Sequence, residues 1–489
     1  MCGKYPCRND AKRGRMPEKR PHLSRFTGPV GESGRPLPLP GRPRRPPRRS
    51  ASRGDSALFG VCDIGTTIVR MSEARSDVLI LGGGVIGLFC ALTLLRRGAT
   101  VRVVDRGETG CGASHGNCGT LTPSHAIPLT VPGMPWRALH WMLRRDAPLY
   151  VSPRPDPERW RWLLDFARRC NLAAAQRAAI ARAAILNRSW TLLPRVLVEE
   201  GIDCEYAPAG NLYVYRTRQT LEHDRPEIEW LHRLGVAATA MTGDVVEQME
   251  PALLPGVVGG ILHADDAQLR PDLLVEGLAR RVREHGGIIE TGAAVQGFRC
   301  ADNRIDAVRT SRGDFAGERV VMALGAWTPR VTAMLDLKVP IQPGKGYSIT
   351  MSRPDPCPRR ALVLREPSVC VTAWGSGYRL GSTMEFSGYD ERLNRTRLDA
   401  LRRGAAAYLR APVGGELREE WWGWRPMCVD EIPLIGPVKR WNNLLLATGH
   451  GMLGVSMSAA TAELVSSLIA GEPPAIDPLA YAPTRFANM

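Results

Sequence analysis

The first regular pattern of apolar residues begins near residue 77. Residues 77–81 form a short, partly β-branched apolar run, typical of a buried strand. Residues 84–97 then predict a helix that ends at two arginines followed by Gly98, a common helix stop. A second apolar run, 101–104, ends on Asp105. The order of strand, glycine-rich turn, helix and strand predicts a βαβ unit with parallel strands.

This region also has the length of a membrane span. Val78 to Leu95 are 18 residues without a charge. Four glycines interrupt the run, however, and Asp105 follows at the distance expected for the end of a second strand. A buried strand, turn and helix explain both features, whereas a span explains neither. We therefore expect no transmembrane segment here.

Further apolar runs are spread over the rest of the chain, and residues 106–150 are loop-like because they are rich in Gly, Ser, Thr and Pro. The patterns predict helices over 158–200, 271–285 and 453–470. They predict strands over 206–215, 257–263, 288–289, 319–324 and 443–447, and a strand-rich region over 339–380.

The order of these elements predicts two discontinuous domains. Strands like those of the first βαβ unit occur at the start, in the middle and at the end of the chain, so the segments between them form inserts. We expect a cofactor-binding domain from 76–120, 260–335 and 425–489, and a substrate-binding domain from 121–259 and 336–424.

The basic charge of the chain is concentrated at its N-terminus. Residues 1–75 carry 17 Lys and Arg against 6 Asp and Glu, and so hold +11 of the net charge of +16. The segment is rich in Arg, Pro and Gly and has almost no apolar periodicity, so we predict a disordered extension. A nucleic-acid-binding arm and an organelle transit peptide are the alternatives. Met71 leads directly into the first strand, as a native N-terminus would.

The 12 cysteines form no CxxC pair and no cluster with histidine. This pattern argues against a structural zinc site or a disulfide framework, so no metal site is predicted. A reducing cytoplasm fits such free thiols best.

The motif that carries chemistry is Gly82-Gly83-Gly84-Val85-Ile86-Gly87. Gly82 permits a tight turn, Gly84 lets the backbone approach a pyrophosphate, and Gly87 lets the helix pack on the strand. The helix N-terminus presents free N–H groups to phosphates. Asp105 is placed to accept hydrogen bonds from ribose hydroxyls. The motif predicts a dinucleotide site but does not separate NAD from FAD.

Two later segments extend this site by resemblance. Residues 114–119 (SHGNCG) and 448–451 (TGHG) look like the flavin-contacting loops of the D-amino acid oxidase superfamily. More specifically, residues 76–486 resemble bacterial FAD-dependent D-amino acid dehydrogenases. The segments that carry the likeness are 119–133, 320–329, 343–350, 423–436 and 447–454.

The resemblance implies an α/β (α+β) fold. Its parts would be a Rossmann-like FAD-binding domain of the glutathione-reductase type and an inserted, mainly antiparallel-sheet substrate domain. FAD is the implied cofactor. The implied cofactor-binding residues are Gly82, Gly84, Val85, Ile86, Gly87, Asp105, Arg106, Ser114, Asn117, Gly119, Val295, Gly325, Gly449, Gly451 and Leu453.

The resemblance also implies oxidative deamination of a D-amino acid. Hydride would leave Cα for flavin N5, and water would hydrolyse the imine. Arg425 is the first candidate for binding the substrate carboxylate, because a guanidinium matches a carboxylate in two-pronged geometry. Tyr347 and His450 are further candidates. Their alternatives are a salt bridge for Arg425, a packed strand tyrosine for Tyr347 and a backbone-only contribution for His450.

Two departures from the family put a D-alanine preference in doubt. Cys428-Val429-Asp430 stands where relatives often have Thr-Pro-Asp, and His125 lies in a loop where they often carry another residue. Trp421, Trp422 and Trp424 either line an apolar pocket or pack in the core. Covalent flavin attachment at Cys428 is a minor alternative.

Several functional readings stay open. The substrate is D-alanine-like, or D-proline or hydroxy-D-proline; the alternative is oxidation of sarcosine, glycine or another secondary amine. An alternative from another functional class is a flavin-binding subunit with a nucleic-acid-binding tail. We expect electrons to pass to a quinone or other acceptor of the respiratory chain. We also expect no nucleic-acid partner, and a cytoplasmic protein with peripheral contact to the inner face of the membrane as an option.

Overall fold

The computed structural model describes residues 75–142 and 149–487. The predicted basic extension therefore lies almost wholly outside the described residues. Within them, one sheet has the strand order β19-β20-β13-β1-β2-β9. Its neighbouring strands are parallel except for the pair β19–β20. The strands are β1 (Ser76–Leu81), β2 (Val101–Val104), β9 (Ile288–Glu290), β13 (Gly317–Met322), β19 (Leu434–Pro437) and β20 (Leu444–Thr448).

This sheet is covered on both faces, which explains the continuous apolar runs of its strands. Ile80 packs on one face with α1 (Val85–Arg96), α8 (Pro271–Glu284) and α11 (Gly454–Ala470). Leu79 and Leu81 pack on the other face, toward a small sheet. The small sheet consists of β10 (Val295–Ala301), β11 (Arg304–Thr310) and β12 (Gly313–Phe315).

A second, mainly antiparallel sheet has the order β18-β14-β17-β16-β15-β5-β7-β6, with β4 paired to β17. Its parallel pairs are β15–β5 and β17–β4. The strands are β4 (Leu149–Val151), β5 (Asn211–Tyr215), β6 (Thr239–Thr242), β7 (Gly259–His263), β14 (Ile341–Met351), β15 (Ala361–Leu364), β16 (Val369–Trp374), β17 (Gly377–Phe386) and β18 (Leu417–Cys428).

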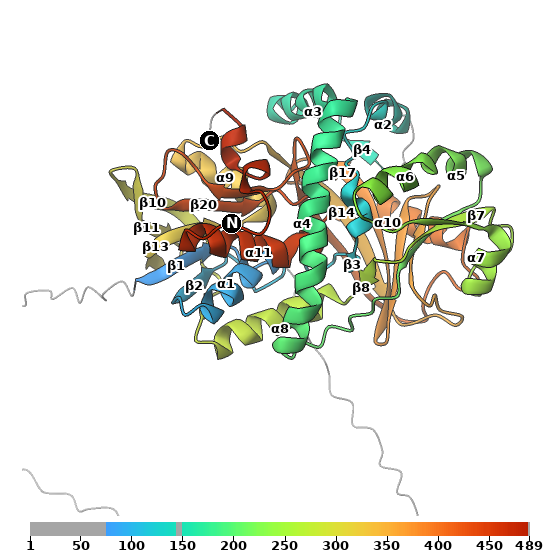
Figure 1. Cartoon of the computed structure of the whole chain (residues 1–489), viewed down its shortest axis with the longest axis horizontal. Helices are drawn as coiled ribbons and strands as arrows, with labels where there is room; N and C mark the ends of the chain where they lie inside the picture. The colour runs from blue at the N-terminus through green and yellow to red at the C-terminus, as the bar shows by residue number, and fades with distance from the viewer. Residues whose placement is uncertain (1–74, 143–148, 488–489) are drawn as a thin grey trace, which may run out of the picture. The chain divides into compact units, whose positions relative to one another are not determined.

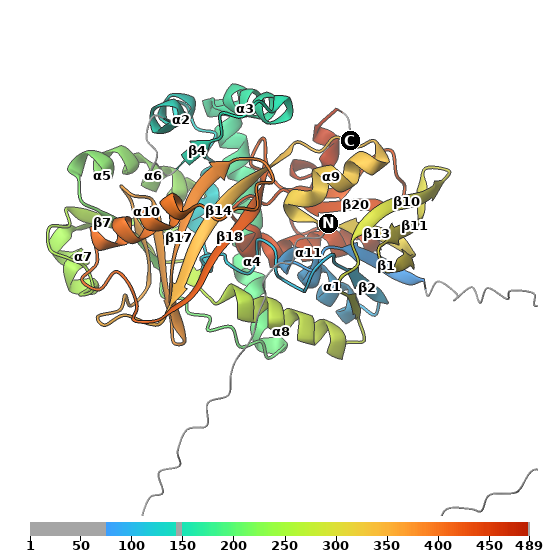
Figure 2. The same ribbon diagram turned by 180° about the vertical axis from the view of Figure 1, so that it is seen from behind.

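Helix α10 (Arg395–Ala406) covers one face of this second sheet, across β14, β16 and β17 (Figure 2). We call this side the α10 face; its apolar cluster includes Tyr347, Val371 and Leu380. Strand alternation turns the next residues the other way. The opposite side is named the loop face, because the loop 114–119 lies against it. Cross-strand pairing assigns to it Tyr213, Gly346, Cys370, Gly381 and Arg425.

The remaining elements connect or flank the two sheets. The long helix α4 packs along α11 (Figure 1). The elements are α2 (Met134–Met142), α3 (Pro157–Arg169), α4 (Leu172–Glu199), α5 (Arg218–Asp224), α6 (Pro226–Arg233), α7 (Gly243–Met249), α9 (Thr328–Thr332), β3 (Thr120–Leu121) and β8 (Ala267–Gln268). Short 3-10 turns include η1 (Pro123–Ala126) and η2 (Gly325–Trp327).

Two predicted elements differ from the structure. The single helix expected over 158–200 is two helices, because the chain breaks at Cys170 and the Asn171 side chain caps α4 by accepting from Ala174 N. The strand expected over 206–215 begins only at Asn211, since Gly210 takes a positive φ of 76° immediately before it. In both cases the type of element was predicted correctly. The errors concern a break within the helix and the first residue of the strand.

The charge-free stretch from Val78 to Leu95 is divided between β1 and α1, as expected. No helix in residues 75–142 and 149–487 is long and apolar enough to cross a membrane. The predicted domain boundaries stay a prediction. Most of β7 and the last residues of β18 fall within the ranges expected for the cofactor-binding domain, but both strands belong to the second sheet.

Candidate functional site

The carboxyl ends of β1, β2, β13 and β20 meet at one edge of the parallel sheet, which is where such folds bind ligands. The turn after β1 is tight. Gly82 has a φ of 110°, and a Cβ there would overlap the carbonyl of Ala323. A Cβ on Gly87 would overlap the carbonyl of Gly82. At Gly84 a Cβ would meet only Ser114 Oγ, at 3.4 Å, so its outer side is open to a ligand.

Helix α1 begins at this turn and has no acidic residue in its first turn. The positive end of its dipole is therefore not neutralised from within the helix. Val85 N donates to Ser114 Oγ at 3.1 Å, which fixes the loop 114–119 beside the helix start. This arrangement suits a pyrophosphate, and it joins three predicted cofactor residues, Gly84, Val85 and Ser114.

Asp105 lies at the end of β2, next to the same turn. Its carboxylate accepts from Gly83 N at 2.6 Å and from Gly107 N at 2.8 Å. Burial raises the pKa of Asp105, while these two backbone donors oppose that shift. Each carboxylate oxygen keeps a second acceptor site, so ribose hydroxyls are still able to donate to it. The guanidinium of Arg106 lies 4.0 Å from the ring centre of Trp327.

Two predicted cofactor residues lie close to these elements. Ala293 N donates to the carbonyl of Asp105 at 2.8 Å, which brings the chain leading to Val295 beside β2. Gly325 follows β13 with a φ of 54°. Its carbonyl accepts from the hydroxyls of Thr328, at 2.7 Å, and Thr448, at 3.2 Å. The ends of β13 and β20 are thereby tied together.

The loop 114–119 bridges the two sheets. Asn117 Oδ1 accepts from Gly119 N at 2.7 Å and shapes the turn, in which Gly119 has a φ of 77°. Arg379 on β17 donates to the carbonyls of His115, at 3.1 Å, and Asn117, at 2.6 Å. Arg379 was not among the predicted residues. The only signal for it was its place in an alternating strand, which does not reveal a contact with a distant loop.

The second predicted loop, 449–453, connects β20 to α11. Gly449 and Gly451 have φ values of 79° and 55°. Gly451 N donates to the carbonyl of Pro426, and Leu453 N donates to that of His450. Since these two N–H groups have protein acceptors, a flavin carbonyl would instead meet the first N–H groups of α11, which lack acceptors inside the helix.

His450 is held inside this loop. Its Nε2 lies 3.0 Å from Thr461 Oγ1 on α11. Burial lowers the pKa of His450 to about 3, so the ring is neutral. The geometry favours a histidine that positions the loop over one that exchanges protons with substrate.

Arg425 lies on the loop face of the second sheet, between the two loops. Its guanidinium passes over Gly346, where a Cβ would overlap it, and Nη1 donates to the carbonyl of Thr383 at 2.7 Å. Burial lowers the pKa of Arg425, yet arginine remains charged at neutral pH. Within the part of the chain that the structure describes, no carboxylate lies within ion-pair distance of it.

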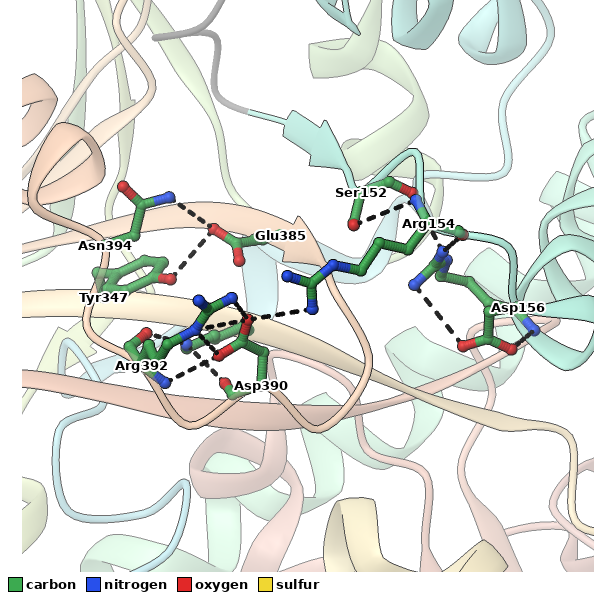
Figure 3. A network of polar contacts seen from close by, with 10 residues as sticks. Ser152, Arg154, Asp156, Tyr347, Glu385, Asp390, Arg392 and Asn394 are labelled. Carbon is green, nitrogen blue, oxygen red and sulfur yellow. Dashed lines mark hydrogen bonds and ion pairs between the residues drawn. The ribbon is translucent and has the colours of Figure 1, made fainter.

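Tyr347 lies on the α10 face, so the structure does not bring it together with Arg425. Its hydroxyl donates to Glu385 at 3.1 Å, and Asn394 donates to the same carboxylate at 3.3 Å (Figure 3). Burial, followed by Glu385, raises the pKa of Tyr347. A substrate role for Tyr347 stays a prediction, and this geometry favours its alternative as a packed strand tyrosine.

The tryptophans of β18 divide between the two faces. Trp421 contacts the loop at Gly116, where a Cβ would overlap its ring. Trp424 packs edge-on against Trp327, Trp422 and Tyr389 and is 1% exposed. Trp424 is therefore a core residue, and only Trp421 of the three reaches the loop face.

Cys428 is buried and His125 is half-buried, and each contacts another side chain. Cys428 Sγ donates to Asp430 Oδ1 at 3.1 Å, and burial holds the pKa of the thiol well above its usual range. A thiol kept protonated in this way is a poor candidate for covalent flavin attachment. His125 Nε2 lies 3.0 Å from the hydroxyl of Tyr213 on the loop face. His125 therefore lies on the side of the second sheet that carries Arg425.

These features fit FAD. The open Gly84, the α1 N-terminus and Asp105 offer the donor and acceptor set for a pyrophosphate and a ribose. The start of α11 offers backbone donors and a positive dipole to an electron-rich ring. Arg425 offers an uncompensated cation for a carboxylate.

The comparisons agree with this site. The chain matches the family model described as FAD dependent oxidoreductase over residues 77–468, and it belongs to that family. The D-amino acid dehydrogenase of Granulibacter bethesdensis is 34% identical over 422 residues, covering 84% of this chain and 100% of the relative. That of Xanthobacter autotrophicus is 32% identical over 420 residues, covering 84% and 99%.

Solved structures show the same fold. Glycine oxidase from Geobacillus kaustophilus aligns with a TM-score of 0.68 at 23% identity, covering 84% of this chain and 99% of its own. L-proline dehydrogenase from P. horikoshii aligns with a TM-score of 0.62 at 20% identity, covering 84% and 98%. The predicted fold class, the FAD cofactor and the assignment as an FAD-dependent oxidoreductase are confirmed.

Proposed function

We propose that the protein oxidises a D-amino acid to its imine, which water then hydrolyses, and that the electrons pass to a quinone or another acceptor. The observation that carries this proposal is Arg425, a half-buried guanidinium with one carbonyl partner and no carboxylate among the described residues. The D-amino acid dehydrogenases that the chain resembles support the substrate class.

The residues of this chain divide the work as follows. Gly82, Gly84, Asp105 and Ser114 would hold the cofactor, which when bound would supply the acceptor for the hydride of the substrate Cα. Arg425 binds the substrate carboxylate and so fixes the orientation of Cα. The positive end of the α11 dipole favours negative charge on a group bound next to the N-terminus of α11. No acid–base pair is needed if the amine binds in its neutral form.

Anaerobic mixing of the purified holoenzyme with a panel of substrates tests the proposal. The panel contains the D and L forms of alanine and proline, hydroxy-D-proline, glycine and sarcosine, and the readout is the bleaching of the flavin absorbance. We expect bleaching by D-amino or D-imino acids and not by their L forms. Bleaching only by glycine or sarcosine would replace the proposal with oxidation of a secondary or achiral amine.

The acceptor and location belong to the same proposal. After anaerobic reduction by the best substrate, we expect a soluble quinone to reoxidise the flavin faster than air does. We further propose that the protein works in the cytoplasm, with peripheral contact to the membrane as the route to a quinone. Reoxidation by oxygen at the faster rate would identify an oxidase instead.

A further inference from the structure

Two thiols meet on the loop face beside Arg425. Cys118 belongs to the loop 114–119, and Cys370 belongs to β16. Neither is used in the function proposed above. Both are partly accessible free thiols, whereas Cys90, Cys204 and Cys428 are fully buried.

Their proximity follows from the strand register. Gly381 on β17 is the direct cross-strand partner of Cys370. A Cβ built on Gly381 would overlap Cys118 Sγ, so this sulfur occupies the space of the missing side chain. Side chains of directly opposed residues have their Cβ atoms about 4.5–5.5 Å apart on the same face. The sulfur of Cys118 therefore lies within reach of the Cys370 side chain.

The loop is held in this position by independent contacts. Arg379 donates to the carbonyls on either side of Gly116, at His115 and Asn117. Gly119 N is held by Asn117 Oδ1. The sulfur of Cys118 is thus presented to β16 by a fixed turn and not by a free-swinging segment.

The charges around the pair are those of a reactive thiol. The neighbouring Cys370 thiol lowers the pKa of Cys118, and the guanidinium groups of Arg425 and Arg379 lower it further against the effect of burial. The Cys118 thiol, together with burial, raises the pKa of Cys370. Cys118 is therefore the nucleophile and Cys370 the protonated partner, the arrangement in which a sulfenic acid is resolved to a disulfide.

We propose that Cys118 and Cys370 form a redox-active pair, beside Arg425, that hydrogen peroxide converts to a disulfide. The Cys118 thiolate attacks the peroxide O–O bond; with one proton, this yields a sulfenic acid and water. The Cys370 thiol then attacks that sulfur and releases a second water. Two thiols lose two electrons and two protons, and the peroxide is reduced to two waters.

Oxidation changes the loop face in one defined way, because it joins the loop 114–119 covalently to β16. The disulfide does not depend on any activity, so it is tested separately from the proposed function.

The test treats the FAD-loaded full-length protein with a small excess of hydrogen peroxide and quenches it with an alkylating reagent. We expect one cross-linked peptide pair joining Cys118 to Cys370, and its loss after dithiothreitol treatment. Cys370→Ala should yield no such pair and should leave Cys118 as a sulfenic acid that a dimedone probe labels. Cys300→Ala, which changes an exposed thiol elsewhere, should behave like the parent protein.

Full alkylation of Cys118 and Cys370 after peroxide would overturn the redox pair. Failure of every D-amino acid to bleach the flavin would instead refute the proposed function and leave the cross-link result standing.

Discussion

Two cations on adjacent strands of the second sheet, the buried Lys345 and the half-buried Arg425, have opposite surroundings. Lys345 on β14 faces the α10 side and is 0% exposed. Its ammonium donates to the carbonyls of Asp390 and Arg392, and Glu385 lies close enough to raise its pKa against the effect of burial. Arg425 on β18 faces the loops and has one carbonyl partner and, among the described residues, no carboxylate.

The difference separates a structural polar network from a binding site. A buried charge is costly unless it is paired and hydrogen-bonded. The α10 face meets this condition within the protein. Lys345 donates to two backbone carbonyls, and the nearby Glu385 carboxylate accepts from Tyr347 and Asn394 (Figure 3). The loop face leaves Arg425 for a ligand to complete. The same residue types therefore have different functions, because their partners differ.

The largest effect is expected for Arg425→Ala, which tests whether the loop face binds the substrate. Truncating one member of a desolvated, hydrogen-bonded charge pair costs about 2–5 kcal/mol in binding, so kcat/KM for the best D-amino acid should fall about 30-fold or more. Arg425→Lys keeps the charge without the two-pronged geometry and should retain part of the activity. Steady-state kinetics measure both, with flavin absorbance and melting temperature as controls. An unchanged KM in Arg425→Ala would place the substrate elsewhere.

The reciprocal change is Glu385→Gln on the α10 face. It removes the carboxylate that pairs with the buried Arg397 at 3.9 Å while keeping the shape of the side chain, and breaking a buried ion pair costs about 3–5 kcal/mol. The melting temperature should fall by several degrees, while KM at a temperature where the variant is folded should stay within about twofold of the parent. A raised KM with an unchanged melting temperature would make the α10 face part of the substrate site.

The sequence predicted the cofactor half of the molecule well because its signals are local. The Gly82–Gly87 motif, Asp105 and the helix over 453–470 are each defined by neighbours within a few residues, and the structure places their ends at one sheet edge. The loops at 114–119 and 449–453 were found by resemblance. Only the structure shows that Arg379 and Pro426 hold them against the second sheet.

The substrate-binding half was harder to predict from the sequence, because its geometry depends on the register between strands that are far apart in the chain. Arg425 and Tyr347 lie on adjacent antiparallel strands, and whether they share a face depends on a pairing that no local pattern reveals. Arg425 pairs with Gly344 and Trp422 pairs with Tyr347, so the two candidates point to opposite sides. The proximity of Cys118 to Cys370 was likewise beyond local reasoning, since 251 residues separate them.

The burial of His450 predicts that the stability of the protein depends on pH. Burial lowers the pKa of His450 to about 3, below the value of about 6.5 expected in the unfolded chain. The unfolded state therefore binds more protons between these values, so stability is full above about pH 6.5 and falls as the pH drops toward 3. The melting temperature measured from pH 7 to pH 4 should decline less steeply in His450→Gln than in the parent. Equal slopes would mean that other groups dominate the acid response.

The smallest effect is expected for Tyr347→Phe, and it sharpens the comparison most finely. The substitution removes only the hydroxyl that donates to Glu385, a bond between buried partners at 3.1 Å. A hydrogen bond to a charged group contributes about 1.5–3 kcal/mol, so the melting temperature should fall slightly. Since the hydroxyl lies on the α10 face, kcat/KM should remain within about twofold of the parent. A loss of tenfold or more at an unchanged melting temperature would show that Tyr347 reaches the substrate, and that the boundary between the two faces does not divide structure from function.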